Sequence, residues 1–358
     1  MIDMYVRIAG RVEVNAASLN AQGTSGNLIE LAKLRVVVSE NGTYRLLEVP
    51  TVTGNAIKHW HFAHFVNAYK MLGGQKLCEY CKRGIGFRSP DEDKSDEGSF
   101  VKDCAGEDVH GFLQPQKQVR RESLFKASFM LPSEEVETGF DTVTHNRVVI
   151  DTKGKVTSEG MMLFKRQYSS SIYGFLMSLD LGYIGRLLYS QEHEKVIDDD
   201  EELRRGKAAL VALLPLLAGE VGASRARALP AWRVREFLVA CSEKPIPQLT
   251  HGRYSDYVAT SLEVLATYSD LMNIGVEVLA YGINERLLES FKEKLKDSGR
   301  GELVKIEIKE SWQGIITNLV QKYEDLMRSK SKIASAAASA ERRDEGASTN
   351  ARSGKRKG

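Results

Sequence analysis

The hydrophobic pattern is most regular at the start of the chain. Residues 5–14 alternate between polar positions and an apolar set formed by Val6, Ile8, Gly10, Val12 and Val14. A period of two residues predicts a β-strand with one buried face. A second strand is predicted at Lys33–Val38, and small side chains, amides and hydroxyls fill the segment Asn15–Asn27 before it. We expect that segment to be a loop whose backbone N–H groups approach a phosphate closely.

Helical periodicity replaces the alternation from about Asn55 onwards. The helix places Ile57, Trp60 and His64 on one face. Lys58, His61 and Phe65 fall on another face, so we expect a core helix with partly exposed histidines. The clearest helix is the last one, because Trp312, Ile315, Leu319, Tyr323 and Met327 belong to a single apolar stripe. Further helices are predicted at Leu203–Leu217, Ser255–Met272 and Glu285–Asp297, and further strands at Ser171–Leu181, Trp232–Cys241, Val276–Tyr281 and Leu303–Ile308.

These elements predict an α+β fold with a ferredoxin-like (RRM-like) core. The core follows the order strand–helix–strand–strand–helix–strand and comprises residues 1–72, 119–133 and 167–327. Residues 73–118 form an inserted polar subdomain. β-prone residues alternate on both sides of a turn at 152–155, so residues 134–166 are expected to form a protruding, thumb-like hairpin. The basic tail, residues 328–358, lacks apolar content and is expected to be disordered.

Charge is distributed unevenly along the chain. Its 50 Lys and Arg residues against 48 Asp and Glu residues give a formal net charge of +2, but the tail alone carries +6 and leaves about −4 for the rest. Nucleic-acid binding would therefore depend on local patches. No apolar run approaches the length of a membrane span, and the N-terminus starts directly into a strand, so we expect a cytoplasmic protein without a membrane partner.

Cysteines cluster in the inserted segment. Cys78-x-x-Cys81 is followed by Cys104 and His110, a set with the general shape of a structural zinc site but with a longer, glycine-rich spacer than is typical. A metal would explain how such a polar segment stays ordered. The alternative is that these are ordinary reduced cysteines in a loop, because four cysteines in a chain of this length do not indicate a disulfide framework.

Several motifs together resemble one known family. They are the first strand with its loop, the second strand, Val49–Lys58, Thr144–Arg147, Glu159–Gly160 and Leu179–Gly185. The chain resembles the backbone subunits of type I CRISPR surveillance complexes (Cascade) in the RAMP superfamily, and most closely the archaeal type I-A Csa/DevR-like branch. The resemblance implies a non-catalytic subunit that needs no cofactor for catalysis. Copies of it would assemble along a CRISPR RNA as a helical filament, with other Cascade subunits, and present the guide for pairing with target DNA.

The resemblance also implies where RNA would be held. In that family a glycine followed by a basic helix start lies against the RNA backbone, a role that Lys58 would fill here. The expected RNA-binding residues outside the hairpin are Asn15, Ser18, Asn20, Ala21, Gln22, Gly23, Lys58, His61, Arg120, Arg121 and His145. On the returning hairpin strand, Met161 and Met162 would wedge against bases while Lys165 and Arg166 contact phosphates, unless these side chains pack inward.

Two other functions compete with this one. An endoribonuclease, metal-dependent or not, would use His59, His61, His64 or His145 as acid and base. Against it, helical spacing scatters three of these histidines over different faces. Related type III subunits cleave RNA with an aspartate in the loop after the first strand, and the segment Asn15–Lys33 contains none. The third function is a regulatory or scaffold protein that binds other proteins.

Overall fold

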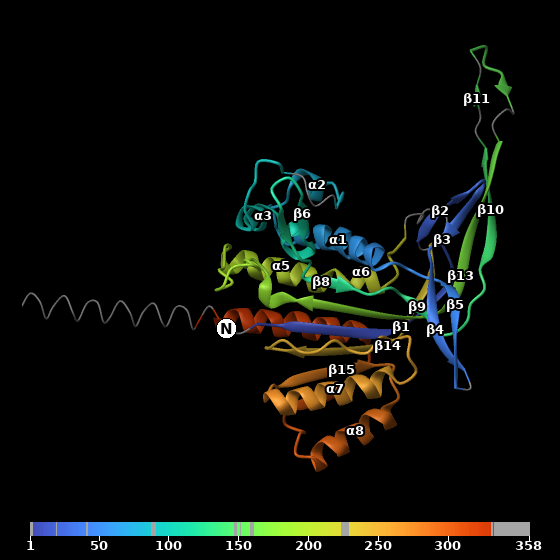
Figure 1. The fold of residues 1–358 in the computed structure, drawn as a ribbon. Helices are drawn as coiled ribbons and strands as arrows, with labels where there is room; N and C mark the ends of the chain where they lie inside the picture. The colour runs from blue at the N-terminus through green and yellow to red at the C-terminus, as the bar shows by residue number, and fades with distance from the viewer. Residues whose placement is uncertain are drawn as a thin grey trace, which may run out of the picture.

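A mixed β-sheet forms the centre of the protein (Figure 1), which is described here from a computed structural model. The structure describes residues 3–18, 20–40, 42–86, 91–146, 149–150, 152–157, 161–222, 229–330 and 332. The main strands lie in the order β16-β15-β14-β1-β13. Their bounds are β1 (Tyr5–Ala17), β13 (Met161–Asp180), β14 (Ala231–Ser242), β15 (Val276–Tyr281) and β16 (Val304–Ile308). β1 pairs antiparallel with both β13 and β14, so the first strand lies inside the sheet.

Strand β1 follows the predicted alternation but is covered on both faces. Val6, Ile8, Val12 and Val14 are fully buried, as expected. Arg7 and Arg11 do not point into solvent, because Arg7 pairs with Asp180 at 2.6 Å and Arg11 donates to the Gly252 carbonyl oxygen at 2.8 Å. At Gly10 a Cβ atom would lie 2.3 Å from the Glu236 carbonyl oxygen, so only glycine allows the two strands to approach here.

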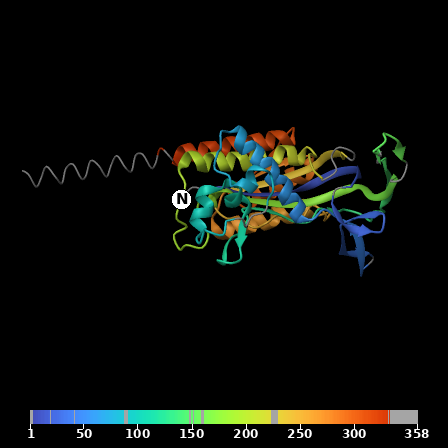
Figure 2. The same ribbon diagram turned by 90° about the horizontal axis from the view of Figure 1, so that it is seen from above.

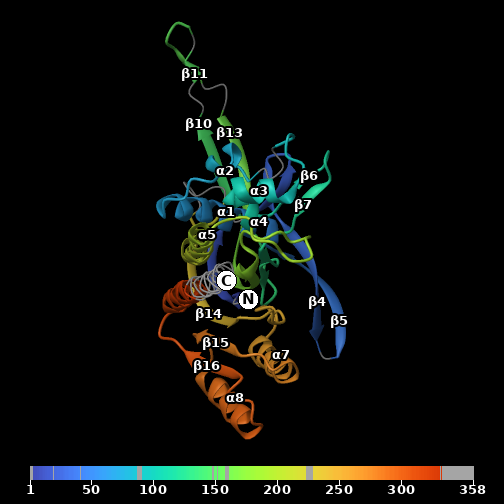
Figure 3. The ribbon, with the colours of Figure 1, turned by 90° about the vertical axis from the view of Figure 1, so that its left-hand side faces the viewer.

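Helices cover the sheet on both sides (Figures 2 and 3). One side carries α1 (Gly54–Met71), α5 (Asp199–Val211), α6 (Leu213–Leu217) and the C-terminal helix, residues 312–330. The other side carries α7 (Tyr257–Met272) and α8 (Glu285–Asp297). Each side has its own buried apolar cluster. The predicted helices are therefore present, except that the expected helix Leu203–Leu217 is divided into α5 and α6 near Ala212.

The inserted segment packs against α1 and contributes to the main core. It contains α2 (Glu79–Lys82), α3 (Glu97–Asp103), α4 (Ala105–His110) and β6 (Phe112–Gln114), and β6 pairs with β7 (Val119–Arg121) just after the segment. Leu77, Cys81, Cys104 and Val109 are buried in the same cluster as the apolar residues of α1. The segment is thus less independent of the core than its polar sequence indicated.

β-Hairpins gather at one end of the sheet, away from the inserted segment (Figure 1). The prediction that Asn15–Asn27 is a loop is wrong in part. Its second half belongs to a β-hairpin, and one strand of this hairpin pairs with β13 of the sheet. A second, isolated hairpin follows it. These two hairpins consist of β2 (Ala21–Ser25) with β3 (Leu28–Leu31), and β4 (Lys33–Glu40) with β5 (Thr43–Pro50).

The long hairpin predicted from the alternating segment is present. β10 (Gly139–Asn146) pairs antiparallel with the first half of β13, from Gly139 opposite Tyr168 to Asn146 opposite Met161. The short strands β11 (Val149–Ile150) and β12 (Val156–Thr157) pair beyond it. On the core side, β8 (Phe125–Ala127) and β9 (Leu131–Pro132) also pair with β13, and the turn η1 (Leu181–Tyr183) follows it.

Two expectations lie largely outside the described residues. Arg147, Glu159 and Gly160 belong to the undescribed part of the hairpin, and most of the tail beyond 330 is undescribed as well. The C-terminal helix continues to 330, two residues past the predicted start of the tail. Among the described residues, no helix is both long and apolar enough to cross a bilayer.

Candidate nucleic-acid interface

The β2–β3 hairpin places an open strand edge beside the base of the long hairpin. β3 pairs in parallel with β13, with Leu28 opposite Lys165 and Ile29 opposite Arg166. The Lys165 N–H donates to the Asn27 carbonyl oxygen at 2.7 Å. β2 is the outermost strand of this sheet, and all five of its residues are exposed. An edge strand of this kind offers backbone N–H and C=O groups to a ligand.

Asn20 and Gln22 fasten this hairpin to its neighbours. The Asn20 Oδ1 atom accepts the Thr53 N–H at 2.9 Å, and Gln22 Oε1 accepts the Lys33 N–H at 3.0 Å. Behind the hairpin, the Leu31 N–H donates to the buried Gln167 side chain at 3.0 Å. The two predicted contact residues therefore position the edge, while Ala21 and Gly23 lie on the exposed strand itself.

The start of α1 adjoins the same region through Asn20. Thr53 caps the helix, and its side chain accepts the Ala56 N–H at 3.2 Å. Gly54 fits tightly against β8, since a Cβ atom there would lie 2.4 Å from the Ala127 carbonyl oxygen. The first turn contains no acidic residue, and Lys58 is half-buried one turn further on. The segment predicted to hold a phosphate is thus a well-anchored helix start.

The two predicted cations on β13 are accessible to different degrees. Lys165 is exposed and Arg166 is half-buried. Tyr168, on the same face as Arg166, is 36% exposed and covers Gly139. The sequence analysis did not include Tyr168 among the expected RNA-binding residues. The available signal was its spacing, because a residue two positions after Arg166 on a strand lies on the same face. The side chains of His145, Met161 and Met162 lie outside the described part, so their predicted roles stay predictions.

Two predicted RNA contacts are wrong, because their side chains are buried. His61 lies stacked on Phe125 with ring centroids 3.7 Å apart, and its Nε2 atom is 3.0 Å from the Ala209 carbonyl oxygen. The Arg121 side chain is fully buried and binds Asp108 at 2.6 Å. Its neighbour Arg120 is exposed over the Tyr189 ring, but β7 pairs with β6 of the inserted segment, which lies far from the hairpins (Figure 1).

Three of the four predicted metal ligands come together. The sulfur atoms of Cys78, Cys81 and Cys104 all lie within 4.8 Å of one another, an arrangement that could hold a metal ion. Hydrogen bonds from the other two thiols lower the pKa of Cys78, whereas burial raises the pKa of Cys104. His110 is not part of this group. Its Nε2 atom lies 2.8 Å from His61 Nδ1 inside the core, so the structure brings together the three cysteines without the predicted fourth ligand.

Comparison with known proteins shows which family the chain belongs to. The family described as "CRISPR-associated negative auto-regulator DevR/Csa2" matches residues 8–262. The chain belongs to the DevR/Csa2 family. This confirms the resemblance that the sequence motifs indicated.

Several relatives of this DevR/Csa2 chain carry CRISPR-associated names. A protein called "CRISPR-associated protein Cas7/Cst2/DevR" from Methanocaldococcus jannaschii is 40% identical over 80% of this chain and 95% of its own length. One of the same name from Thermoproteus tenax is 44% identical over 78% and 87%. The "CRISPR-associated aCascade subunit Cas7/Csa2 2" of Saccharolobus solfataricus is 29% identical over 79% and 93%.

Two of the four histidines proposed for a nuclease are held inside the fold of the DevR/Csa2 chain, and the side chain of a third, His145, lies outside the described part. His61 is fully buried, and burial lowers its pKa to about 3. His64 is also buried and lies 2.8 Å from the Glu220 carbonyl oxygen through Nε2, whereas His59 is exposed. Acid–base catalysis needs groups that reach the substrate. His61 and His64 are held inside the fold and do not meet that condition.

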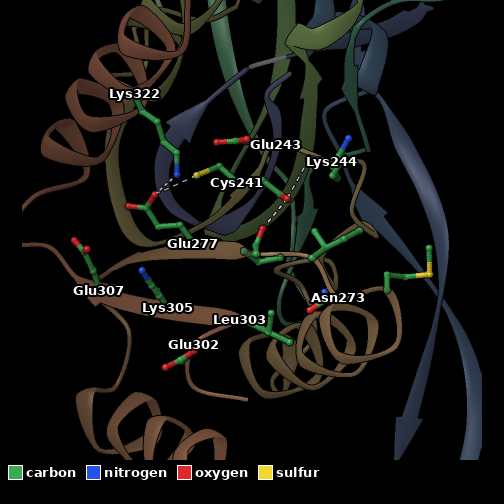
Figure 4. A pocket seen from close by; sticks show the side chains of 15 residues that line it. Cys241, Glu243, Lys244, Asn273, Glu277, Glu302, Leu303, Lys305, Glu307 and Lys322 are labelled. Atoms are coloured by element: carbon green, nitrogen blue, oxygen red, sulfur yellow. Dashed lines mark hydrogen bonds and ion pairs between the residues drawn. The ribbon is translucent and has the colours of Figure 1, made fainter. Parts of the chain in front are cut away.

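A separate cavity lies at the other end of the sheet (Figure 4). It has a volume of about 760 Å³, and Lys322 pairs there with Glu277, which also lies 3.7 Å from the Cys241 sulfur. Its other charged lining residues are Glu243, Lys244, Glu302, Lys305 and Glu307. Acidic and basic groups are mixed here, and Cys241 pairs with Val6 near the start of β1. The cavity is therefore distinct from the hairpin region and lacks the positive charge that would attract RNA.

Proposed function

We propose that this chain is a non-catalytic subunit that binds the backbone of a CRISPR RNA. The observation that carries the proposal is the exposed strand β2, which is separated from Lys165 and Arg166 of β13 by β3 and is tied by Asn20 to the start of α1. Backbone amides and cations suit phosphate contacts that do not depend on sequence. A relative named as an aCascade subunit supports the same assignment.

The topology supports a ferredoxin-like core. β14, β1, β13 and β8 are adjacent in that order, and α1 and α5 supply the two helices between strands. We assign residues 1–72, 119–133 and 167–327 to this core, 73–118 to the insertion and 134–166 to a thumb. The thumb would press on the guide and reach a neighbouring copy in a helical filament, so that the filament and other Cascade subunits present the guide to target DNA.

Charge reversal at the base of the thumb tests this proposal. The double variant Lys165→Glu/Arg166→Glu should lose at least about ten-fold of the RNA that copurifies with the chain, because phosphate contacts dominate such binding. The matched control is Lys294→Glu/Lys296→Glu on α8, which makes the same charge change at exposed positions on the opposite side of the sheet.

Absorbance ratio, sequencing of bound RNA and light scattering would be measured on both variants after circular dichroism has confirmed their folding. Equal RNA content in the two variants would refute the placement of the site. Shortening of added RNA by the RNA-free protein would favour the endoribonuclease instead.

We also propose that the cysteine cluster holds a structural zinc ion. Three thiolates at this spacing suit zinc, and two of them, Cys81 and Cys104, are fully buried. A closed site of this kind contributes to folding rather than to chemistry.

A further inference from the structure

The cysteine cluster is built from two short helices that begin in the same way. Cys78 is the N-cap of α2, and Cys81 follows it three residues later. Cys104 is the N-cap of α4, and Glu107 follows it three residues later. In a helix, side chains three positions apart lie on the same face. Each helix therefore offers two ligand-bearing side chains from equivalent positions.

Glu107 is the buried acidic residue of this arrangement. It is 1% exposed, and its Oε1 atom has no hydrogen-bond partner among the described residues. A buried carboxylate oxygen without a partner is costly, so native proteins pair such atoms or bind them to metals. Cys104, at the other end of the same turn, makes no side-chain cap hydrogen bond.

Tight packing holds the two helix starts together. A Cβ atom on Gly106 would lie 2.8 Å from the Cys81 sulfur and 3.0 Å from the Phe62 ring, so glycine is required between Cys104 and Glu107. The Ala105 N–H donates to the Lys76 carbonyl oxygen at 2.9 Å, which fixes α4 to the segment before α2. The Cys78 sulfur accepts the Cys81 N–H at 3.4 Å. These contacts preorganise the sulfur atoms for one ion.

We infer that Glu107 is the fourth ligand, so that Cys78-x-x-Cys81 and Cys104-x-x-Glu107 together bind one Zn²⁺ ion. This inference rests on the zinc proposal above and is independent of RNA binding. The carboxylate lies outside the group of sulfur atoms within 4.8 Å of one another, so this assignment requires a change of the Glu107 side-chain rotamer on metal binding. Three thiolates and one carboxylate oxygen give four ligands of types that zinc binds, the number that a tetrahedral structural site needs.

The consequence for the fold is a clamp on the inserted segment. Cys81 and Gly106 both lie against the core, and Gly106 faces Phe62 of α1. The ion would therefore fasten α2 and α4 to each other and to the helix whose start adjoins the proposed RNA surface. Removing it should loosen the insertion and leave the sheet in place.

The test compares the zinc affinity of full-length variants by competition with a chromophoric chelator, with metal content from mass spectrometry. The wild-type chain should hold one zinc ion. Glu107→Gln, which keeps the side-chain shape, should weaken zinc binding by at least about ten-fold. His110→Gln, which keeps an N–H for His61, should leave the zinc affinity unchanged.

A second variant, which adds a ligand, tests the same assignment if the Glu107→Gln chain fails to fold. Glu107→Cys should bind zinc more tightly and, with Co²⁺ in place of zinc, raise the thiolate-to-metal absorbance by about a third, because four thiolates replace three. Equal zinc affinity in the wild-type chain and the Glu107→Gln variant would overturn the assignment of Glu107. A wild-type chain that binds no added Zn²⁺ would overturn the zinc proposal itself. RNA content, measured on the same samples, reports on the RNA proposal separately.

Discussion

At the scale of single residues, burial decides which polar side chains face a ligand. His61 and Arg121 have the residue types of an RNA site, yet each fills a position inside the core. His61 accepts or donates through both ring nitrogens, to His110 and to the Ala209 carbonyl oxygen. Because a carbonyl oxygen accepts, the Nε2 atom of His61 carries the proton and Nδ1 is the acceptor. The neutral ring is therefore the form that the fold selects.

Because His61 is neutral in the folded chain, the free energy of unfolding depends on pH. Burial lowers the pKa of His61 from 6.5 to about 3, so the unfolded chain takes up a proton that the folded chain refuses. The stabilisation is fully present above pH 6.5 and is lost as the pH falls from 6.5 towards 3, by up to about 1.4 kcal/mol per pH unit.

Urea unfolding of the His61→Phe variant between pH 7 and pH 5 should show a shallower decline than the wild type, although its stability at pH 7 should be lower because two hydrogen bonds are removed. His59→Phe, at an exposed position, is the matched control and should keep the wild-type slope. Identical slopes in all three proteins would contradict this explanation.

At the scale of elements, a buried ion network joins the inserted segment to α5. Asp108 of α4 binds Arg121 of β7 at 2.6 Å and Arg205 of α5 at 2.8 Å. It also accepts the Gly185 N–H at 2.9 Å, just after η1. In the motif Leu179–Gly185, it is therefore the backbone N–H of Gly185 that binds the central carboxylate of this network.

Removal of the central charge should be strongly destabilising. Asp108→Asn leaves the buried Arg121 and Arg205 with Glu97 and Glu201 as their remaining acidic partners and removes the carboxylate that both share, so we expect a loss of about 3–5 kcal/mol in the free energy of unfolding. Asp103→Asn, an exposed acid paired with Lys94 in the same segment, should cost less than about 1 kcal/mol. Equal losses in urea unfolding would show that Asp108 is not the centre of the network.

The elements themselves were largely predictable, but their partners were not. The alternation of residues 5–14 and the stripe of the last helix predicted β1 and the C-terminal helix, because burial on one face leaves a periodic pattern. Arg120 and Arg121 look alike in the sequence, and only the position of Asp108, on a different short helix, separates them. The second half of Asn15–Asn27 became a hairpin because β13 supplies a strand for it to join. Such long-range pairing has no local signal.

At the scale of the whole molecule, the proposed RNA surface and the chain ends lie apart. The hairpins gather at one end of the sheet, while the N-terminus and the end of the C-terminal helix lie together at the other (Figure 1), where Lys330 is 3.4 Å from Asp3. Proposed RNA contacts and terminal charges therefore belong to different regions.

Removal of residues 333–358 should leave RNA retention within about two-fold of the full chain at physiological salt, because the tail is attached far from the proposed contacts. The removed residues have six basic and three acidic side chains, and their charge of +3 would add only to weak binding that disappears as salt rises. RNA retained by the truncated chain and by the full chain would be compared at two salt concentrations. A truncated chain that retains no RNA would place the binding site in the tail.

The central position of β1 also sets the order of events during synthesis. Tyr5 pairs with Asp180 on one side and with Ser242 on the other, so the first strand made waits for partners more than a hundred residues away. At about 5–20 residues per second, the ribosome needs on the order of ten to fifty seconds to deliver both neighbours. During that interval Val6, Ile8, Val12 and Val14 belong to an apolar segment without its sheet. The nascent chain is therefore most prone to aggregation before β14 emerges, and chaperones that bind extended apolar segments would act on this protein in that interval.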